Sequence, residues 1–191
     1  MKYLATTLIA IIVAGGLLGG CAGNRATVFL HPEFTFNFVE RVAIIPFDNL
    51  SKEQGAGARV THVFLTELLS SKAFDVVEPG EVSRVLEKHG IVRTSNLTKE
   101  QIISIGTELK VQGLFLGAVN ELASTRSGNA VTNSVTLVVR MVETESGEIV
   151  WSATQNSGGR GFWSSLFGTG GKSQSQAIRD CVSSILRTLI K

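Results

Sequence analysis

The stretch Val42-Ala43-Ile44-Ile45-Pro46-Phe47 decides how the rest of this chain is interpreted. It closes a run from Val39 to Phe47 with consecutive β-branched residues, which is typical of a strand covered on both faces. Pro46 marks the end of that strand, because proline cannot continue a sheet ladder. A strand buried in this way needs helices packed against it, so the run indicates an α/β domain.

Apolar spacing on either side of this strand predicts the remaining elements. Helices are expected where apolar residues recur every three or four positions, as Val60, Phe64 and Leu68 do. Thr98 to Gln101 forms a capping box, which starts a helix that runs to Leu109. The expected helices span about residues 52–71, 79–88, 98–109 and 175–190, and the expected strands span 39–47, 74–78, 111–122, 135–143 and 148–155.

The order of these elements predicts an α/β fold with a mixed β-sheet flanked by helices. A strand, a helix and a second strand come first, followed by two helices, a third strand, a hairpin and a terminal helix. The hairpin turn lies at Thr144 to Gly147, where glycine supplies a positive φ. One domain over residues 38–191 is expected, with a flexible loop at 156–174.

The beginning of the chain resembles a bacterial lipoprotein signal. Lys2 precedes an apolar run, and Leu18-Gly19-Gly20-Cys21 resembles the site cut by lipoprotein signal peptidase. The alternative is a transmembrane anchor, but the run is shorter than the roughly 20 residues needed to span a bilayer. Residues 1–20 are therefore predicted to be a signal peptide, Cys21 the lipid-bearing residue and 21–37 an extended tether. Ala22 after the cysteine implies delivery to the periplasmic face of the outer membrane.

Charge and cysteine content exclude several classes of protein. The formal net charge is +2, and the Lys and Arg residues are scattered among acidic ones, so a nucleic-acid surface is not indicated. Cys181 is the single cysteine besides Cys21, which leaves no partner for an intrachain disulfide. Cys181 lies on the apolar face of the last predicted helix and is expected to be buried rather than reactive.

Several of these segments, in this order, resemble the curli production assembly and transport (CsgG) family. The similar segments are Val42 to Phe47, Phe74 to Glu78, Leu114 to Val119 and Val142 to Trp151. The resemblance covers most of residues 38–155 and the terminal helix. It implies the periplasmic α/β fold also seen in the TolB N-terminal domain and in lipoprotein activators of penicillin-binding proteins.

One departure from that family limits what the resemblance implies. A secretion channel of this type needs two membrane hairpins per subunit, with strands of about 9 to 11 residues that alternate in polarity. Ala123 to Ser134 is polar, and Asn156 to Gln174 is rich in glycine and serine with no period of two. The chain is therefore predicted to resemble the periplasmic domain without its pore.

No motif in the sequence supports catalysis or a cofactor. Gly168 to Ser173 looks like a phosphate-binding loop, but Leu166 stands where such a loop needs its first glycine, so no nucleotide is expected. His31, His62 and His89 have no second ligand at metal-binding spacing. The sequence therefore predicts no metal, no cofactor and no enzymatic activity.

Two aromatic groups are the candidate binding residues. Phe162, Trp163, Leu166 and Phe167 lie in a glycine-bounded loop, where they either contact a partner or a membrane, or fold back over the sheet. Phe34, Phe36 and Phe38 alternate in the tether and are candidates for a subunit contact or for the core.

These observations favour a non-enzymatic outer-membrane lipoprotein that binds an envelope protein and assists assembly, secretion or envelope maintenance. Two alternatives remain open. One is a structural subunit that forms a homo-oligomeric ring, and the other is an activator of a peptidoglycan synthase.

Overall fold

The computed structural model describes residues 26–94, 96–127, 130–158 and 172–190. Within these ranges the chain forms, in order, β1 (Thr27–Leu30), the 3-10 helix η1 (Phe36–Phe38), β2 (Arg41–Ile44), β3 (Asp48–Asn49), α2 (Ala56–Ser71), β4 (Asp75–Val76), α3 (Pro79–Lys88), α4 (Lys99–Leu109), β5 (Gly113–Ser127), β6 (Ala130–Glu143), β7 (Ile149–Ser157) and α6 (Gln174–Leu186).

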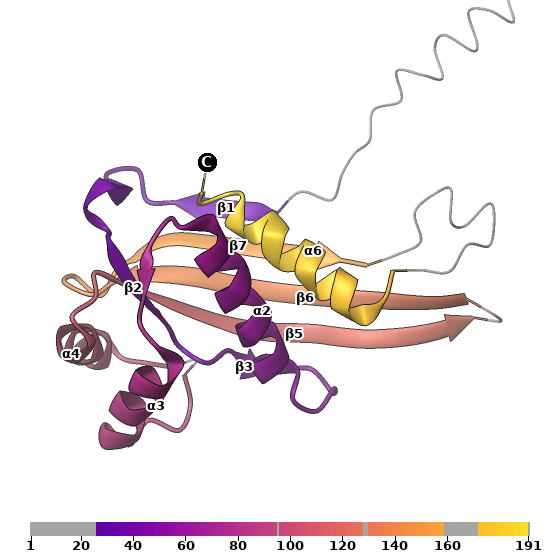
Figure 1. The fold of residues 1–191 in the computed structure, drawn as a ribbon, viewed down its shortest axis with the longest axis horizontal. Helices are drawn as coiled ribbons and strands as arrows, with labels where there is room; N and C mark the ends of the chain where they lie inside the picture. Colours follow the sequence, from indigo (N-terminus) through magenta and orange to yellow (C-terminus); the bar gives the residue numbers. More distant parts are fainter. Residues whose placement is uncertain (1–25, 95, 128–129, 159–171, 191) are drawn as a thin grey trace, which may run out of the picture.

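The strands join in one mixed sheet, as the sequence predicts. Across the described residues it has seven strands in the order β1-β7-β6-β5-β2-β4, and β3 pairs with β5 beside this path. β2 runs parallel to β4 and to β5, whereas β5, β6, β7 and β1 pair with one another antiparallel (Figure 1). The domain is therefore α/β, with a parallel part near β2 and an antiparallel part that ends at β1.

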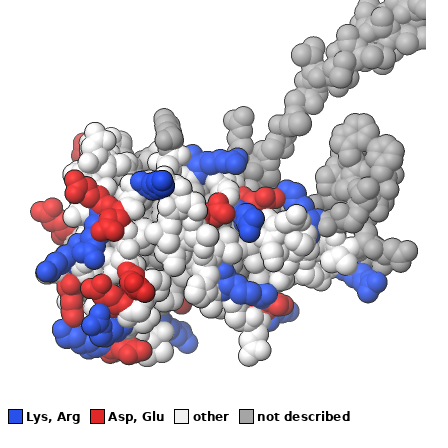
Figure 2. Space-filling model, viewed as in Figure 1, with Lys and Arg blue, Asp and Glu red and all other residues white. Residues whose placement is uncertain are grey.

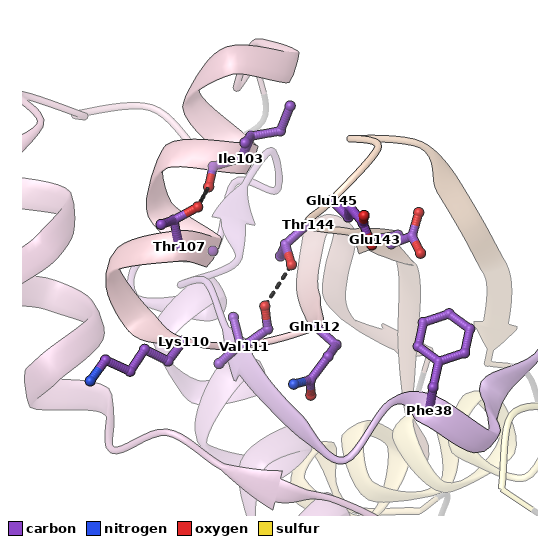
Figure 3. A pocket seen from close by; sticks show the side chains of 10 residues that line it. Phe38, Ile103, Thr107, Lys110, Val111, Gln112, Glu143, Thr144 and Glu145 are labelled. Carbon is purple, nitrogen blue, oxygen red and sulfur yellow. Dashed lines mark hydrogen bonds between the residues drawn. The ribbon is translucent and has the colours of Figure 1, made fainter.

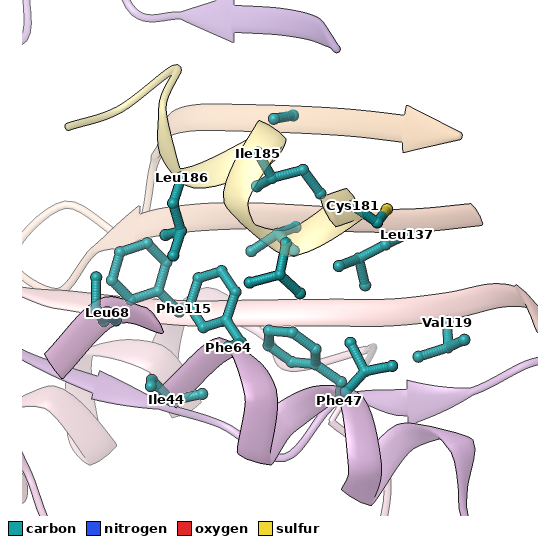
Figure 4. Close-up of a cluster of buried hydrophobic side chains, with 14 of the residues drawn as sticks. Ile44, Phe47, Phe64, Leu68, Phe115, Val119, Leu137, Cys181, Ile185 and Leu186 are labelled. Carbon is teal, nitrogen blue, oxygen red and sulfur yellow. The ribbon is translucent and has the colours of Figure 1, made fainter. Parts of the chain in front are cut away.

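Helices α2 and α6 lie side by side across one face of the sheet (Figure 1). Phe64 of α2 is fully buried between Phe47 and Phe115, with ring centroids 5.2 and 5.3 Å away in edge-to-face geometry (Figure 4). Ile185 and the thiol of Cys181 on α6 are also fully buried, which confirms the prediction for that cysteine. Burying a side chain such as Phe64 stabilises the fold by roughly 1.5–3 kcal/mol.

Helices α3 and α4 cover the opposite face, but only near β2 and the first part of β5 (Figure 1). Alternate residues of β2 enter the two cores: Val42 and Ile44 pack below α2, while Ala43 packs with α3 and α4. This arrangement confirms that the continuous apolar run of the sequence reflects burial on both faces.

Helix ends follow the local chemistry that the sequence indicates. In the capping box of α4 the Gln101 amide donates to Thr98 Oγ1 at 3.3 Å, and the Thr98 amide donates to Gln101 Oε1 at 2.9 Å. Helix α2 begins at Ala56 rather than near Lys52, because Gly55 precedes it with a φ of 72°. A Cβ at Gly57 would lie 2.3 Å from the carbonyl oxygen of Phe47, so the first turn requires glycine for close approach.

The expected extended tether differs from the structure in two places. Thr27–Leu30 forms β1, which pairs antiparallel with β7, so the sheet begins before Phe38. Phe36–Phe38 is a 3-10 helix and not an extended segment. Aromatic residues spaced two apart can pack together either in a strand or in a short helical turn, so this spacing does not distinguish the two. In the structure the ring of Phe34 contacts those of both Phe36 and Phe38.

Strands β5 and β6 are both longer than the sequence predicts, and they pair with each other as a hairpin. Its polar segment 123–134 indicates a loop, yet residues 123–127 pair with 130–134 and extend the two strands beyond α2 (Figure 1). Main-chain hydrogen bonds need no apolar side chain, and threonine is well suited to strands. A register shift between Val119 and Glu121 marks where this extension begins.

Basic and acidic side chains are interspersed on the face seen in Figure 2, and they gather at the end where α3 and α4 lie. In the part of the chain that the structure describes, none of the helices combines the length and the apolar character needed to cross a bilayer.

Candidate binding surface

A groove of about 470 Å³ opens at the end of the molecule near α4. Three walls form it, and each comes from a different part of the chain: Phe38 from η1, Ile103 and Thr107 from α4, and Glu143 and Glu145 from the end of β6 and its turn (Figure 3). The α4 to β5 connection supplies the floor, which consists of residues 110–112. Residues far apart in sequence thus meet around one hollow.

Close packing between α4 and the β6 turn fixes the shape of the groove. A Cβ on Gly106 would lie 2.3 Å from Cβ of Thr144, so a larger residue in α4 would push the turn away. The Thr144 hydroxyl donates to the carbonyl oxygen of Val111 at 2.5 Å (Figure 3), and the Thr144 amide donates to the carbonyl oxygen of Gln112 at 3.1 Å. Thr144 is buried, so these bonds hold the turn against the floor.

Hydrogen bonds to the Gln112 side chain also fix the approach of the η1 segment. Gln112 Oε1 accepts from the Arg41 amide at 2.8 Å and from the Glu40 amide at 3.3 Å. These bonds position the chain that leaves Phe38, and they place its ring at the wall opposite α4 (Figure 3). The groove is therefore held in its open form by the protein's own contacts.

The groove presents two exposed apolar side chains, Phe38 and Ile103, and an acidic wall at the β6 turn, while the basic Lys110 lies at its floor. Phe38 is 48% exposed and Ile103 is 37% exposed, which is high for side chains of this size. Among the described residues, Glu143 and Glu145 form no ion pair, although the Ser146 hydroxyl donates to Glu143. Such a surface fits a segment that carries apolar and basic side chains.

The candidate aromatic residues of the tether have different positions. Phe34 and Phe36 are half-buried and pack against the core below α2. Their rings meet edge to face, with centroids 4.8 Å apart, and Phe34 meets Phe38 at 5.0 Å. Phe38 is the one member of the trio that lines the groove, so the trio stays a prediction as a subunit contact.

The other candidate residues lie mostly outside the described part of the chain. Cys21 and the aromatic residues Phe162, Trp163, Leu166 and Phe167 are not among the described residues, and neither is most of the loop expected at 156–174. Two residues of the glycine-rich stretch that resembles a phosphate-binding loop are described. Lys172 forms an ion pair with Asp180, and Ser173 caps α6 by accepting from the Gln176 amide.

One cluster of titratable side chains, around Glu108 on α4, is held together by hydrogen bonds and ion pairs. Glu108 lies between Lys88 and His89, with distances of 2.7 Å to Lys88 Nζ and 2.9 Å to His89 Nε2. Hydrogen bonds from Lys88 and then from His89 hold the pKa of the Glu108 carboxyl below its ordinary value. In the described residues no group of three or more His, Cys, Asp and Glu side chains is arranged to hold a metal ion.

Sequence reasoning did not find the groove, because its residues lie apart in the chain. One local signal was available, namely the glycine at position 106 within an otherwise regular helix. A glycine inside a helix often marks a close approach of another segment. The spacing of apolar residues in α4 identifies only Ile102, Ile105 and Leu109, which face the core.

The fold places the chain in a class of α/β domains with known structures. Two crystal forms of PelC from Paraburkholderia phytofirmans are similar. The dodecamer of a single-substitution variant has a TM-score of 0.61 at 15% identity and covers 87% of this chain and 98% of that one. The second dodecamer has a TM-score of 0.59 at 14% identity and covers 86% and 96%. Lipoprotein GNA1162 from Neisseria meningitidis has a TM-score of 0.58 at 14% identity and covers 78% and 97%.

The sequence itself assigns the family. The family model described as peptidoglycan-synthase activator LpoB matches residues 36–156, which is more than half of the chain. The chain therefore belongs to the LpoB family of peptidoglycan-synthase activators. No curated protein matches it significantly in sequence.

This finding corrects the resemblance to the CsgG family. The LpoB match spans the same segments, including Val42 to Phe47 and Phe74 to Glu78. The physical reason is that these motifs describe a strand buried on both faces and a short edge strand. Chains of different families that share this fold need the same residue types there.

Proposed function

We propose that this protein activates a peptidoglycan synthase by binding it through the groove around Phe38. Family membership supplies the class of activity, and it supports the alternative of a synthase activator over a general assembly or secretion role. The single observation that carries the choice of surface is the groove itself, with its exposed Phe38 and its acidic wall. The protein acts by contact rather than by catalysis.

The binding chemistry follows from the walls of the groove. An apolar side chain of the synthase packs between Phe38 and Ile103, and a basic side chain meets Glu143 or Glu145. Burial of an aromatic surface supplies most of the affinity, while the charges set orientation and association rate. Because the floor is hydrogen-bonded in place, little ordering cost is expected on binding.

The test measures glycan polymerisation by a purified peptidoglycan synthase with increasing amounts of the full-length protein. Phe38→Ser is expected to raise the concentration needed for half-maximal stimulation by about 10-fold, equivalent to roughly 1.4 kcal/mol. Glu145→Lys is expected to act in the same direction. Val92→Ser is the matched control, because Val92 is 93% exposed and does not line the groove.

Two results would count against this proposal. Unchanged stimulation with both groove variants would remove the groove from the interface, while leaving the family's activity in place. Absence of stimulation by the unmodified protein, with every synthase of the envelope tried, would overturn the activation itself. Thermal unfolding of each variant checks that the fold is intact.

Attachment to the membrane is part of the proposal. The lipid on Cys21 would hold the domain at the periplasmic face of the outer membrane, from which it reaches the synthase. Incorporation of labelled palmitate into the wild-type protein, and its loss in Cys21→Ser, tests this. Membrane fractionation without any incorporation would contradict the anchor.

The loop residues Phe162, Trp163, Leu166 and Phe167 remain a proposed second contact with the partner or the membrane. Replacing all four with serine is expected to weaken partner capture while leaving thermal stability unchanged. A large loss of stability would show that these side chains belong to the core.

A ring-forming subunit is the second candidate function. The observation that favours it is the dodecameric state of the two PelC structures, which share the fold along nearly their whole length. The mass of the full-length protein in detergent separates a ring from smaller species.

A further inference from the structure

Strand β1 forms an edge of the sheet, and within the described residues no strand lies beside its outer main-chain groups. It pairs with β7 in a register that places Phe29 opposite Ser152 and Leu30 opposite Trp151. The His31 amide donates to the carbonyl oxygen of Val150 at 2.9 Å, which fixes the alternation of the ladder. Hydrogen-bonded pairs alternate along antiparallel strands, so Phe29 bonds to β7 while the amides and carbonyls of Val28 and Leu30 face outward.

The side chains of this edge are large, apolar and exposed. Val28, Phe29 and Leu30 are 38%, 48% and 49% exposed, and residues 26–30 contain no charged side chain. Val28 and Leu30 lie on the side of α6, because they stand opposite the core residues Ala153 and Trp151. Phe29 lies on the other side. An uncharged edge whose outward main-chain groups meet no strand of the described residues is a template for another strand.

The position of the edge in the chain indicates which strand can reach it. Thr27 follows Cys21 by only a few residues, so the edge lies within about 20 Å of the predicted lipid anchor. Copies anchored in one leaflet therefore carry this edge at one height above the membrane, where confinement raises their effective concentration. The same edge on a second copy has the matching donors, acceptors and apolar side chains.

We propose that β1 pairs with β1 of a second copy on the membrane, antiparallel about a two-fold axis, and joins the two sheets into one. The proposal uses the predicted anchor for its location and is independent of synthase activation. The outward groups set the register: Val28 of each copy bonds with Leu30 of the other. Phe29 then lies opposite Phe29 of the second copy, as a non-hydrogen-bonded pair with Cα atoms about 4.5 Å apart.

The size of the contact predicts when the pair forms. One short strand per copy buries less than the roughly 1,200 Å² typical of stable complexes. Pairing is therefore weak between freely diffusing copies and becomes favourable between copies held on one membrane. Charge on the strand would prevent it, because like charges would stand across the two-fold axis.

Disulfide trapping tests the register directly, with the full-length lipidated protein in phospholipid vesicles and a mild oxidant. Phe29→Cys is expected to form a disulfide-linked dimer, because the Cα separation suits a disulfide. Thr27→Cys is the matched control on the same strand and face. In this register the two copies of residue 27 are four positions apart along the strands, roughly 13 Å, so its dimer should form at least about 10-fold more slowly. Cys181 is buried in both variants.

Additional variants test whether the strand that pairs with β1 belongs to a second copy of the protein. Adding Val28→Lys to Phe29→Cys is expected to abolish the disulfide dimer, and adding Cys21→Ser is expected to reduce it by about 10-fold or more, since the confinement is lost. Equal rates for Phe29→Cys and Thr27→Cys would overturn the proposal. So would a disulfide that forms only between a Thr27→Cys copy and a Phe29→Cys copy, or protection of Phe29→Cys from thiol reagents without any dimer.

Discussion

The two edges of the sheet differ in almost every property that controls strand association. β1 has four residues, an uncharged sequence and three exposed apolar side chains. β4 has two residues, and its Asp75 lies 3.3 Å from Arg41 of the neighbouring strand. Pro79 begins α3 soon after β4 ends, so the chain leaves the edge at once. Short length and charge are the usual protections of an edge strand; β4 is the shorter of the two strands, and only β4 carries a charged side chain.

The difference shows that exposed apolar side chains are concentrated at one edge of this small sheet. At the β4 side, helices α3 and α4 cover the neighbouring strands and carry paired charges. At the β1 side, the exposed strand rests directly on β7, whose Trp151 is fully buried. The β1 edge therefore adjoins the larger apolar core. A strand that pairs with β1 would bury apolar surface there, which stabilises the contact.

The largest expected effect comes from the core beneath the open edge. Trp151→Ala should lower the free energy of unfolding by about 3–5 kcal/mol, since it leaves a large cavity. The change also removes the hydrogen bond that the indole Nε1–H donates to Thr188 Oγ1 at 3.1 Å. Chemical denaturation measures the loss, with Leu50→Ala as control, because Leu50 is 65% exposed. A loss below about 1 kcal/mol would mean that β1 and α6 do not depend on this side chain.

For each pH unit, a smaller effect is expected from the thiol of α6 at alkaline pH. Burial raises the pKa of Cys181 to about 12 from its ordinary value of 9.0. The unfolded chain loses this proton above pH 9 while the folded chain keeps it, so stability should fall as the pH rises from 9 towards 12. The slope for one proton is at most about 1.4 kcal/mol per pH unit.

Denaturation at mildly and strongly alkaline pH, on either side of the ordinary thiol pKa, checks this expectation, with Cys181→Ala as the control that lacks the titrating group. Native protein should also resist alkylation by iodoacetamide at mildly alkaline pH and react once unfolded. Rapid alkylation of the native protein would show that α6 does not seal the core next to the open edge.

The smallest effect on stability is expected at acid pH, in helices α3 and α4 near the β4 edge. Lys88 and His89 lower the pKa of Glu108, so the ionised carboxylate stabilises the fold above its ordinary pKa of 4.5. That contribution is lost as the pH falls through the lowered folded value. Melting temperatures near neutral pH and well below pH 4.5 should therefore differ less in Glu108→Gln than in wild type. Glu87→Gln makes the same charge change on α3 as a control, and an equal response of both variants would contradict the role of Glu108.

Local sequence signals predicted the elements that depend on local chemistry. The run Val42 to Phe47 predicted the strand buried on both faces, and the Thr98 to Gln101 pattern predicted the cap of α4. The polar residues 123–134 misled the prediction, because their strand pairing comes from main-chain bonds that leave no apolar pattern. The predicted resemblance to the CsgG family was wrong for a related reason. The motifs on which it rested are shared by chains with this fold, and they do not identify the binding partner.

The groove shows the limit of the same reasoning. Phe38 was a candidate because it is aromatic, but nothing in its spacing distinguishes it from Phe34 and Phe36. The distinction arises where α4 and the β6 turn meet, at Gly106 and Thr144.

The sequence by itself determined the α/β class, the mixed sheet and the buried cysteine, because apolar periodicity and capping are short-range properties of the chain. Tertiary structure alone decided which aromatic ring faces solvent, that β1 joins the sheet at an open edge, and that Glu143 and Glu145 share a groove with Phe38. These features depend on contacts between residues far apart in the chain, as Glu40 and Gln112 are. No local pattern of residue types encodes which distant segments will pack together.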